Sequence, residues 1–549
     1  MKTLLLFNLT LLLVCFALLQ DQSSFRKNKT HPNLEKKYTE LYKKIAHHIE
    51  EKYVEKRSLE EILKNGLYGL TKSLDPYSTL LSTPKRTYYE DMKTGSYGGV
   101  GLHLSKIEED LVILFVLPGS PSSKLNLKPG DKIKLINSER TEKLSLAQCS
   151  EKLKGKKNTY VHLTVKREHE KKTFKVKIKR GDIPLRNVAF SDFIAKDIFY
   201  IKINSFSKDI DISLSKAFHI SKRANAKSLI LDFRGNSGGL LSSSLALLDL
   251  IFDKKERILE LRGQDGTVLE KHETKNSLHL DKKVKIFALI DKESASASEI
   301  VAGALQDLDR AVVIGSQSFG KGLVQKIYNI NREISLKITT ARYYTPSGRS
   351  LQKRDYYKEE EQKDSLFQTR NGRKVEAKGG ITPDIEIEPK PYPPFIRALA
   401  QKNLFLFFVS TYEKLYELKT PIEIGPEILK NFENYVKNHH LEYYLDGELA
   451  YKKFKEELEE KKDSQNIENI QATLGSIDQY YKDLKDSSFD QEENKKWIKR
   501  ELLGKFSYVL LGQEEEIKQK IKEDSIIKKA LEISSNDSLY QSILKPKKF

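Results

Sequence analysis

The chain has 549 residues, enough for roughly three or four domains, of which 38% are hydrophobic and 32% are charged. Its net charge of +19 arises from 96 basic against 77 acidic residues. The lysines are spread along the chain without arginine-rich blocks, so we expect no nucleic-acid partner. Of the two cysteines, only Cys149 lies outside the leading apolar segment. An exported form therefore cannot contain an intramolecular disulfide.

The first twenty residues have the pattern of a targeting segment. Lys2 supplies a positive charge, and Leu4 to Leu19 is apolar apart from Asn8 and Thr10. This run is closer in length to a signal-peptide core than to the ~20 residues of a full membrane span. We therefore expect residues 1–20 to act as a signal peptide or a membrane anchor, and the rest of the chain to be exported.

Residues 33–92 are predicted to form a helical N-terminal region. Apolar residues recur at helical spacing in its first part, namely Leu34, Tyr38, Leu41, Tyr42, Ile45 and Ile49. A second helix is expected to begin at Ser58, because Glu61 three residues later completes the signature of a capping box. It should end before the turn Leu74-Asp75-Pro76.

After the helical region the sequence pattern changes from one type of predicted structure to another. Residues 96–182 contain short β-like runs separated by turns, which predicts a β-rich domain. Residues 186–388 alternate strand-like and helix-like segments, which predicts an α/β core. Past Pro389 the sequence is helical in character, so residues 390–549 are predicted to form a helical C-terminal domain.

The segment Ser294-Ala295-Ser296-Ala297-Ser298-Glu299 lies between a predicted strand and a predicted helix. Its small residues allow a sharp turn that exposes a hydroxyl at the helix N-terminus, where unpaired N–H groups and the helix dipole favour negative charge. The oxyanion of an acyl-transfer reaction needs this setting. The alternative interpretation is an ordinary serine-rich helix cap.

A lysine, Lys321, lies between Gly320 and Gly322 after a predicted strand. Close packing around the glycines could shield the amine from water and lower its pKa from ~10.4 towards about 7–8, as a general base requires. On a strand, Gln325 would lie on the same face as Lys321 and could orient the amine. The alternative is a surface lysine in a hairpin.

A third segment runs from Asp232 to Gly239, where a buried strand breaks into a glycine-rich loop before a helix. Such a loop can direct backbone N–H groups at an oxyanion or at a phosphate, although the Lys-Ser/Thr ending of a P-loop is absent. All eleven histidines lie outside these three segments, and the nearest in sequence are His219, His272 and His279. A serine–lysine pair is therefore favoured over a serine–histidine pair.

Together the motifs resemble the C-terminal processing peptidases, or tail-specific proteases, a family of serine peptidases with an embedded PDZ domain. The resemblance extends over about residues 34–388 and rests on five motifs in the family's order. These are Leu74-Asp75-Pro76-Tyr77-Ser78, Gly98-Gly99-Val100-Gly101, Asp232 to Gly239, Ser294 to Glu299 with Phe319 to Gln325, and Gly379-Gly380-Ile381-Thr382-Pro383-Asp384. It implies an α/β multi-domain fold, with an α/β protease core, an inserted β-rich PDZ domain and helical regions at both ends.

By position, the resemblance places the nucleophile on Ser296, the general base on Lys321 and the supporting amide on Gln325. It further implies an oxyanion hole formed by the backbone N–H groups of Ala297 and of one glycine in the pair 238–239, of which Gly238 is preferred. The function implied is that of a serine endopeptidase.

Asp307 matches an acidic position that matters in some members of the family. Its distance along the predicted helix from Ser296 points to a structural role.

The PDZ domain implied by the resemblance would bind the C-terminal ends of proteins or peptides. Its carboxylate-binding residues would be Gly99, Val100 and Gly101, with Leu102 beside the groove. The family also couples docking there to activation of the protease. An exported member would act in a bacterial periplasm or at the outer face of the inner membrane, with membrane association through its N-terminus as one outcome.

We expect neither a metal nor another cofactor, because the adjacent pairs His47-His48 and His439-His440 point to different helix faces. In the tail, apolar residues recur at intervals of 3, 4, 3, 4 and 3 positions. This pattern fits either a helix packed within its own domain or a helix through which two copies associate. The spaced residues are Ile467, Ile470, Leu474, Ile477, Tyr481 and Leu484. The hypothesis retained is a homodimer through this domain.

Two other functions were weighed against the endopeptidase. A catalytically silent PDZ scaffold of the same fold is disfavoured because Ser296, Lys321 and Gln325 are all present. A histidine-assisted relative is disfavoured because the motifs contain no histidine.

Overall fold

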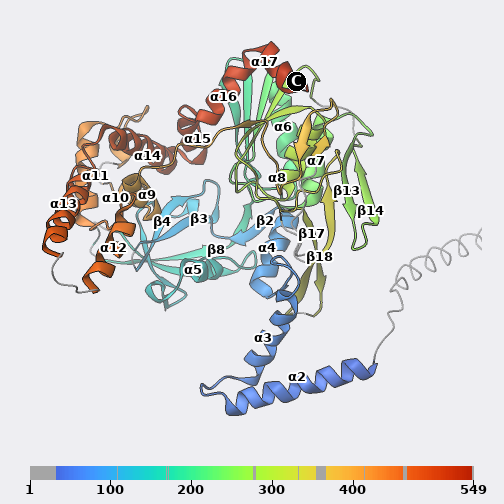
Figure 1. The fold of residues 1–549 in the computed structure, drawn as a ribbon. Helices are drawn as coiled ribbons and strands as arrows, with labels where there is room; N and C mark the ends of the chain where they lie inside the picture. Colours follow the sequence, from blue (N-terminus) through green and yellow to red (C-terminus); the bar gives the residue numbers. More distant parts are fainter. Residues whose placement is uncertain are drawn as a thin grey trace, which may run out of the picture. The chain divides into compact units, whose positions relative to one another are not determined.

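The computed structural model describes residues 32–546, except 108, 168, 169, 171, 276–279, 332, 354–365, 413, 414 and 461–466 (Figure 1). The predicted targeting segment, residues 1–20, lies outside the described residues. The chain divides into two compact units, one comprising Met1–Leu80 with Leu336–Ile338 and the other Leu81–Ser335 with Thr339–Phe549.

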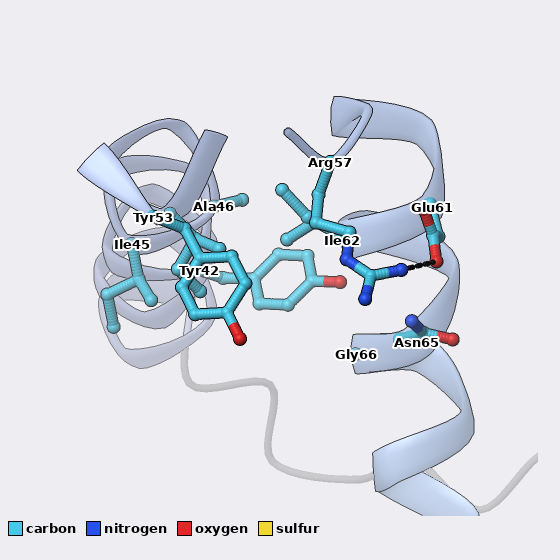
Figure 2. Close-up of a pocket in the computed structure, with 10 residues that line it drawn as sticks. Tyr42, Ile45, Ala46, Tyr53, Arg57, Glu61, Ile62, Asn65 and Gly66 are labelled. Atoms are coloured by element: carbon cyan, nitrogen blue, oxygen red, sulfur yellow. Dashed lines mark hydrogen bonds and ion pairs between the residues drawn. The ribbon is translucent and has the colours of Figure 1, made fainter. Parts of the chain in front are cut away.

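The first unit contains two helices, α2 (Pro32–Lys52) and α3 (Leu59–Lys72). The Ser58 hydroxyl caps α3 by accepting the Glu61 N–H at 3.2 Å, as the sequence predicts. Facing side chains of α2, α3 and the turn between them line a cavity of about 500 Å³ (Figure 2). The apolar stripe of α2 remains largely open, with Leu34 52% and Tyr38 57% exposed. A short strand, β1 (Thr79–Leu81), follows.

The β-rich domain follows α4 (Thr83–Thr94) and is built on an antiparallel sheet in the order β3-β4-β5-β7-β8, with β6 on β5. Its strands are β3 (Leu102–Ile107), β4 (Asp110–Val116), β5 (Lys132–Ile136), β6 (Glu139–Arg140), β7 (Tyr160–Lys166) and β8 (Phe174–Lys179). Helix α5 (Leu146–Leu153) begins at a capping box between Ser145 and Gln148. A separate pair, β2 (Ser96–Gly99) with β9 (Gly181–Pro184), connects the domain to the chain on both sides.

The α/β core is a six-stranded sheet in the order β10-β11-β12-β15-β16-β21. Its strands are β10 (Val188–Ala195), β11 (Ile198–Ile203), β12 (Ser228–Asp232), β15 (Lys285–Ile290), β16 (Ala311–Gly315) and β21 (Ile385–Glu386). From β11 onwards neighbouring strands are parallel, while β10 is antiparallel to β11. The central strands are uninterrupted apolar runs because both faces of a parallel sheet are covered.

Successive residues of these strands face two different helix layers, as the period of two in a strand requires. On one face, residues such as Ile201, Leu231 and Ala288 pack against α6 (Ile210–Arg223), α7 (Leu241–Ile251) and α8 (Ala297–Asp307). On the other face, Ile230 and Phe287 pack against α16 (Ser525–Ser534) and α17 (Asp537–Ile543) (Figure 1). The last two helices thus belong to the α/β core, which differs from the predicted single helical domain over 390–549.

Residues of a second sheet pack into the same hydrophobic core as α6, α7 and α8. Its strands β14 (Val268–Glu273), β13 (Arg257–Arg262) and β18 (Ser335–Tyr344) are adjacent and antiparallel, and β17 (Leu323–Asn329) pairs with β18. A short hairpin of β19 (Leu366–Gln368) and β20 (Lys374–Glu376) follows.

Four tail helices form a cluster with its own aromatic core, which includes Phe405, Phe408, Phe432 and Phe506. They are α9 (Pro394–Gln401), α10 (Leu404–Thr411), α11 (Pro426–Asn438) and α14 (Glu492–Leu511). The tail also contains α12 (Glu448–Glu460), α13 (Ile467–Asp486) and α15 (Gln513–Ile521), and Ile517 and Ile521 of α15 pack beside α16 against the central sheet. Among the helices that the structure describes, none has both the length and the apolar character needed to cross a bilayer.

The tail cluster touches the β-rich domain through aromatic side chains. Tyr508 of α14 hydrogen-bonds His103 of β3 and lies 5.3 Å, centroid to centroid, from the ring of Phe115. Within the tail, α13 packs against α12: Leu474 is buried, and Tyr481 lies 5.7 Å, between ring centroids, from Tyr451. Leu474 and Tyr481 belong to the spaced residues of α13, so part of that face is used within the tail, whereas Ile470 remains 37% exposed.

Candidate active site

Ser296 stands at the N-terminus of α8, directly after the turn that leaves β15. Its backbone adopts φ 56° and ψ −112°, a conformation that is sparsely populated by residues other than glycine. The two flanking hydroxyls are buried and occupied, because Ser294 donates to the Phe233 carbonyl and Ser298 to the Asn236 carbonyl, each at 2.9 Å. Ser296 is only half-buried. Of the three serines, the middle one therefore presents its side chain at the surface of the core.

The glycine loop after β12 lies against this turn. A β-carbon added to Gly238 would stand 2.9 Å from the Ala297 nitrogen and 2.9 Å from the Ser296 β-carbon. Only glycine leaves this space open, and it also accommodates the φ of +101° at position 238. In this structure the Gly238 N–H donates to Oδ1 of Asn236 at 2.9 Å.

Lys321 lies in the loop between β16 and β17 and is brought next to Ser296 by shared partners. The backbone N–H groups of Ser296 and Lys321 donate to the same oxygen, Oε2 of Glu299, at 2.8 and 2.9 Å. The Tyr343 hydroxyl also joins the two residues, because it donates to the backbone carbonyl oxygen of Lys321 and lies 3.4 Å from the backbone carbonyl oxygen of Ser296. Residues 25 positions apart in sequence are thus neighbours in the fold.

Gln325 lies within β17, and its side-chain amide donates to Oγ1 of Thr339 on β18 at 3.3 Å. Lys321 precedes the first residue of that strand, Leu323. The expected same-face relation along one strand therefore does not describe this pair, because the glycine-flanked lysine belongs to the irregular loop.

Glu299 was not among the residues singled out from the sequence. Its side chain is fully buried, and burial raises its pKa above the ordinary value, while hydrogen bonds from Ser318, Lys321, Gly320 and Ser296 oppose that rise. The pattern Ser296-x-x-Glu299 is a capping-box signature and could have indicated the bond to the Ser296 N–H. The partners at residues 318–321 come from another loop and leave no local signal.

At the other end of α8, Asp307 pairs with Arg349 at 2.7 Å, and both side chains are closed to solvent. The eleven-residue helix separates this pair from Ser296 by about 16 Å. The ion pair therefore lies at the C-terminal end of α8, away from Ser296.

A buried charge cluster anchors the start of the glycine loop. Burial alone would raise the pKa of Asp232, but Arg234 and Lys202 hold it well below its ordinary value. Arg234 also donates to Oδ2 of Asp524, the N-cap of α16, at 2.8 Å. The loop beside Ser296 is thereby tied to a helix near the end of the chain.

The predicted peptide-binding residues lie together where β2 leads into β3. Gly99 ends β2, Val100 is buried, Gly101 has a φ of +77°, and Leu102 opens β3 and packs on the core of the domain. The carbonyls of Val100 and Gly101 accept the N–H groups of Ser122 and Leu117, each at 3.0 Å. Helix α5 packs beside β3.

Comparison with known proteins decides the family. A carboxy-terminal-processing protease of Bartonella bacilliformis is 30% identical over 312 residues, which cover 56% of this chain and 71% of the relative. The carboxy-terminal processing protease CtpB of Bacillus subtilis is 31% identical over 336 residues, which cover 61% and 68%. The chain belongs to the carboxy-terminal processing proteases of peptidase family S41. The resemblance noted in the sequence is confirmed.

Family models locate the parts of this S41 peptidase. The model of peptidase family S41 matches residues 197–357, and that of the PDZ domain matches residues 90–166. A model described as "Probable PDZ-protease, C-terminal helical domain" matches residues 395–533. A solved photosystem II D1 C-terminal processing protease is 22% identical, with a TM-score of 0.35, and the match covers 64% of this chain and 93% of that one.

Proposed function

We propose that this S41 protease cleaves exported proteins with a Ser296–Lys321 dyad, after capturing their C-terminal ends in its PDZ domain. The observation that carries the proposal is the shared Oε2 of Glu299, which makes the backbones of the two residues neighbours. The half-buried state of Ser296, between two serines whose hydroxyls are occupied, supports the same assignment.

In the proposed reaction the neutral Lys321 amine takes the Ser296 proton as the hydroxyl oxygen attacks the scissile carbonyl. The resulting ammonium then donates that proton to the leaving amine, and an acyl-enzyme remains. In the second half, water gives a proton to Lys321 as its oxygen attacks the acyl carbon. The bond between that carbon and the Ser296 oxygen then breaks, and the serine oxygen takes the proton from the Lys321 ammonium, which releases the acid and restores both residues. Activity should therefore rise with pH as Lys321 loses its proton.

The oxyanion would form beside the first turn of α8. The Ala297 N–H belongs to that turn, where backbone donors have no acceptor within the helix. The Gly238 N–H would be the second donor, and it would first exchange its bond to Asn236 Oδ1 for one to the oxyanion. Gln325 is proposed to orient the Lys321 amine, which its amide could reach by leaving Thr339.

The PDZ domain supplies the substrate class. We assign the terminal carboxylate to the backbone around Gly99, Val100 and Gly101, with the peptide running along β3 from Leu102. Substrates are then proteins with free C-termini in the bacterial periplasm or at the outer face of the inner membrane, where residues 1–20 would deliver or anchor the protease.

A homodimer through the tail remains a proposal, and it would have to form beside the contact of α13 with α12 through Leu474 and Tyr481. Light scattering on the exported chain tests it, and a monomer would reject it.

The decisive assay compares a peptide with a free apolar C-terminus against its amidated twin. Wild type should cleave the free peptide faster, and Ser296→Ala and Lys321→Ala should cleave neither. Both variants should still bind the free peptide, since the PDZ residues are unchanged. Cleavage by Lys321→Ala would reject the dyad, and an inactive wild type that binds the peptide would favour the silent scaffold.

A further inference from the structure

Four donors from two separate segments converge on one buried carboxylate. Oε2 of Glu299 accepts the backbone N–H groups of Ser296 at 2.8 Å and Lys321 at 2.9 Å. Oε1 accepts the Gly320 N–H at 2.7 Å and the Ser318 hydroxyl at 2.6 Å. Glu299 has no solvent exposure. A buried carboxylate is costly unless its lone pairs are occupied, so this full set of donors makes the side chain a rigid junction.

The junction does more than cap a helix. A capping box asks the Glu299 carboxylate for one bond only, to the Ser296 N–H, whereas its three other bonds reach the loop that carries Lys321. Because a single oxygen accepts both amides, the carboxylate ties the backbone of the nucleophile to the backbone of the base.

The Glu299 carboxylate also holds the unusual backbone conformation of Ser296. Residues in sparsely populated conformations persist only where several contacts hold them, and the φ of 56° with ψ of −112° is such a conformation. The N–H of this strained residue is held by Glu299. The carboxylate thus helps to keep the serine in the orientation that presents its hydroxyl.

We propose that Glu299 is a positioning residue for the reaction, which sets the distance and orientation between Ser296 and Lys321 through their backbone amides. This inference rests on the proposed serine–lysine dyad. Glu299 touches neither substrate nor the reacting atoms, so its effect must appear in the rate of the chemical step and leave peptide docking unchanged.

Two variants test separately the position of the Glu299 carboxylate and its negative charge. Glu299→Asp keeps the carboxylate but withdraws it by one carbon–carbon bond, about 1.5 Å, so that it cannot reach both segments. Glu299→Gln keeps the length but has one acceptor oxygen, and its NH₂ group would face donors. The matched control is Glu448→Gln, which alters another buried carboxylate that accepts a backbone N–H, from Leu445, but lies in the tail helix α12.

The experiment uses the full chain and measures kcat and KM for the free-C-terminus peptide. It also measures the rate and final extent of Ser296 labelling by a sulfonyl fluoride. In labelling, the serine oxygen bonds to sulfur, fluoride leaves, and Lys321 takes the proton. For Glu299→Asp and Glu299→Gln we expect kcat and the labelling rate to fall about 100-fold, while KM and the final extent stay near wild type. Glu448→Gln should match wild type in all four quantities.

Misfolding gives the opposite pattern, a reduced extent of labelling at an unchanged rate, and would overturn the proposal. A Glu299→Asp variant with kcat and labelling rate within twofold of wild type would also overturn it. These failures differ from failure of the dyad, which would appear as cleavage by Ser296→Ala or Lys321→Ala.

Discussion

Arg349 and Asp307 form an ion pair from which solvent is fully excluded, with 2.7 Å between guanidinium and carboxylate. The Asp307 carboxylate also accepts the Ser347 N–H at 3.0 Å. The pair joins the last turn of α8 to the segment that follows β18, while the first turn of the same helix carries Ser296. The helix is therefore fixed at both ends by buried carboxylates, Glu299 at its start and Asp307 at its finish.

Asp307→Ala should lower the free energy of unfolding by about 3–5 kcal/mol, because it leaves the Arg349 charge buried without an opposite charge beside it. Urea denaturation measures the loss. Asp253→Ala, which removes an exposed ion pair with Lys282, should change the stability by less than about 1 kcal/mol. The double variant Asp307→Leu with Arg349→Met should be more stable than Asp307→Ala. An Asp307→Ala protein as stable as wild type would contradict this account.

Gly238→Ala should lower kcat by about 100- to 1000-fold, the effect of losing an oxyanion donor. The added β-carbon would stand 2.7 Å from the Ala295 carbonyl oxygen and 2.9 Å from the Ala297 nitrogen, in the space proposed for the oxyanion. Gly266→Ala is the matched control, because that residue also has a positive φ, +73°, but no atom lies within 4 Å of the added carbon. Equal kcat values for the two variants would argue against an oxyanion hole at Gly238.

Ser296→Gly should be more stable than Ser296→Ala by about 1 kcal/mol or more, although both are inactive. Glycine adopts the observed backbone conformation at position 296 without the strain that any β-carbon imposes. The comparison of two inactive variants also prevents self-cleavage during the measurement. Thermal melts that rank the alanine variant higher would show that the turn carries no strain.

The contact between the PDZ domain and the tail should loosen in acid. Desolvation of the imidazole and the nearby Arg186 lower the pKa of His103 below its ordinary value, although the residue keeps exposed surface, so at pH 7.5 the imidazole that meets Tyr508 is uncharged. Below about pH 6.5 the unfolded chain then binds more protons than the folded one. The contribution of His103 to stability is thus complete above about pH 6.5 and is lost as the pH falls through the folded pKa.

Amide hydrogen exchange in β3 and α14 at pH 7.5 and pH 5 measures this effect. Wild type and His162→Gln, a change at an exposed histidine of β7, should lose protection in acid to the same extent. His103→Gln should lose less, because glutamine does not titrate. An unchanged pH dependence in His103→Gln would exclude the histidine as the cause.

Local signals predicted much of the fold and part of the candidate site. The Ser58 cap of α3, the apolar runs of the parallel strands and the turn at Ser296 each depend on residues close together in sequence. The position of the Gln325 side chain relative to Lys321 was less predictable. It depends on where β17 begins, and that strand begins at Leu323, after the lysine. The junction at Glu299 and the packing of α16 on the sheet depend on segments that are far apart in the chain, and no periodicity records such contacts.

The packing of α16 and α17 on the central sheet also has a consequence for biosynthesis. Until residues 525–543 have left the ribosome, α16 and α17 cannot bury sheet residues such as Ile230 and Phe287. The nascent protease domain would then expose an apolar face of its central sheet. That face of the protease core is therefore completed only after the last two helices have been synthesised.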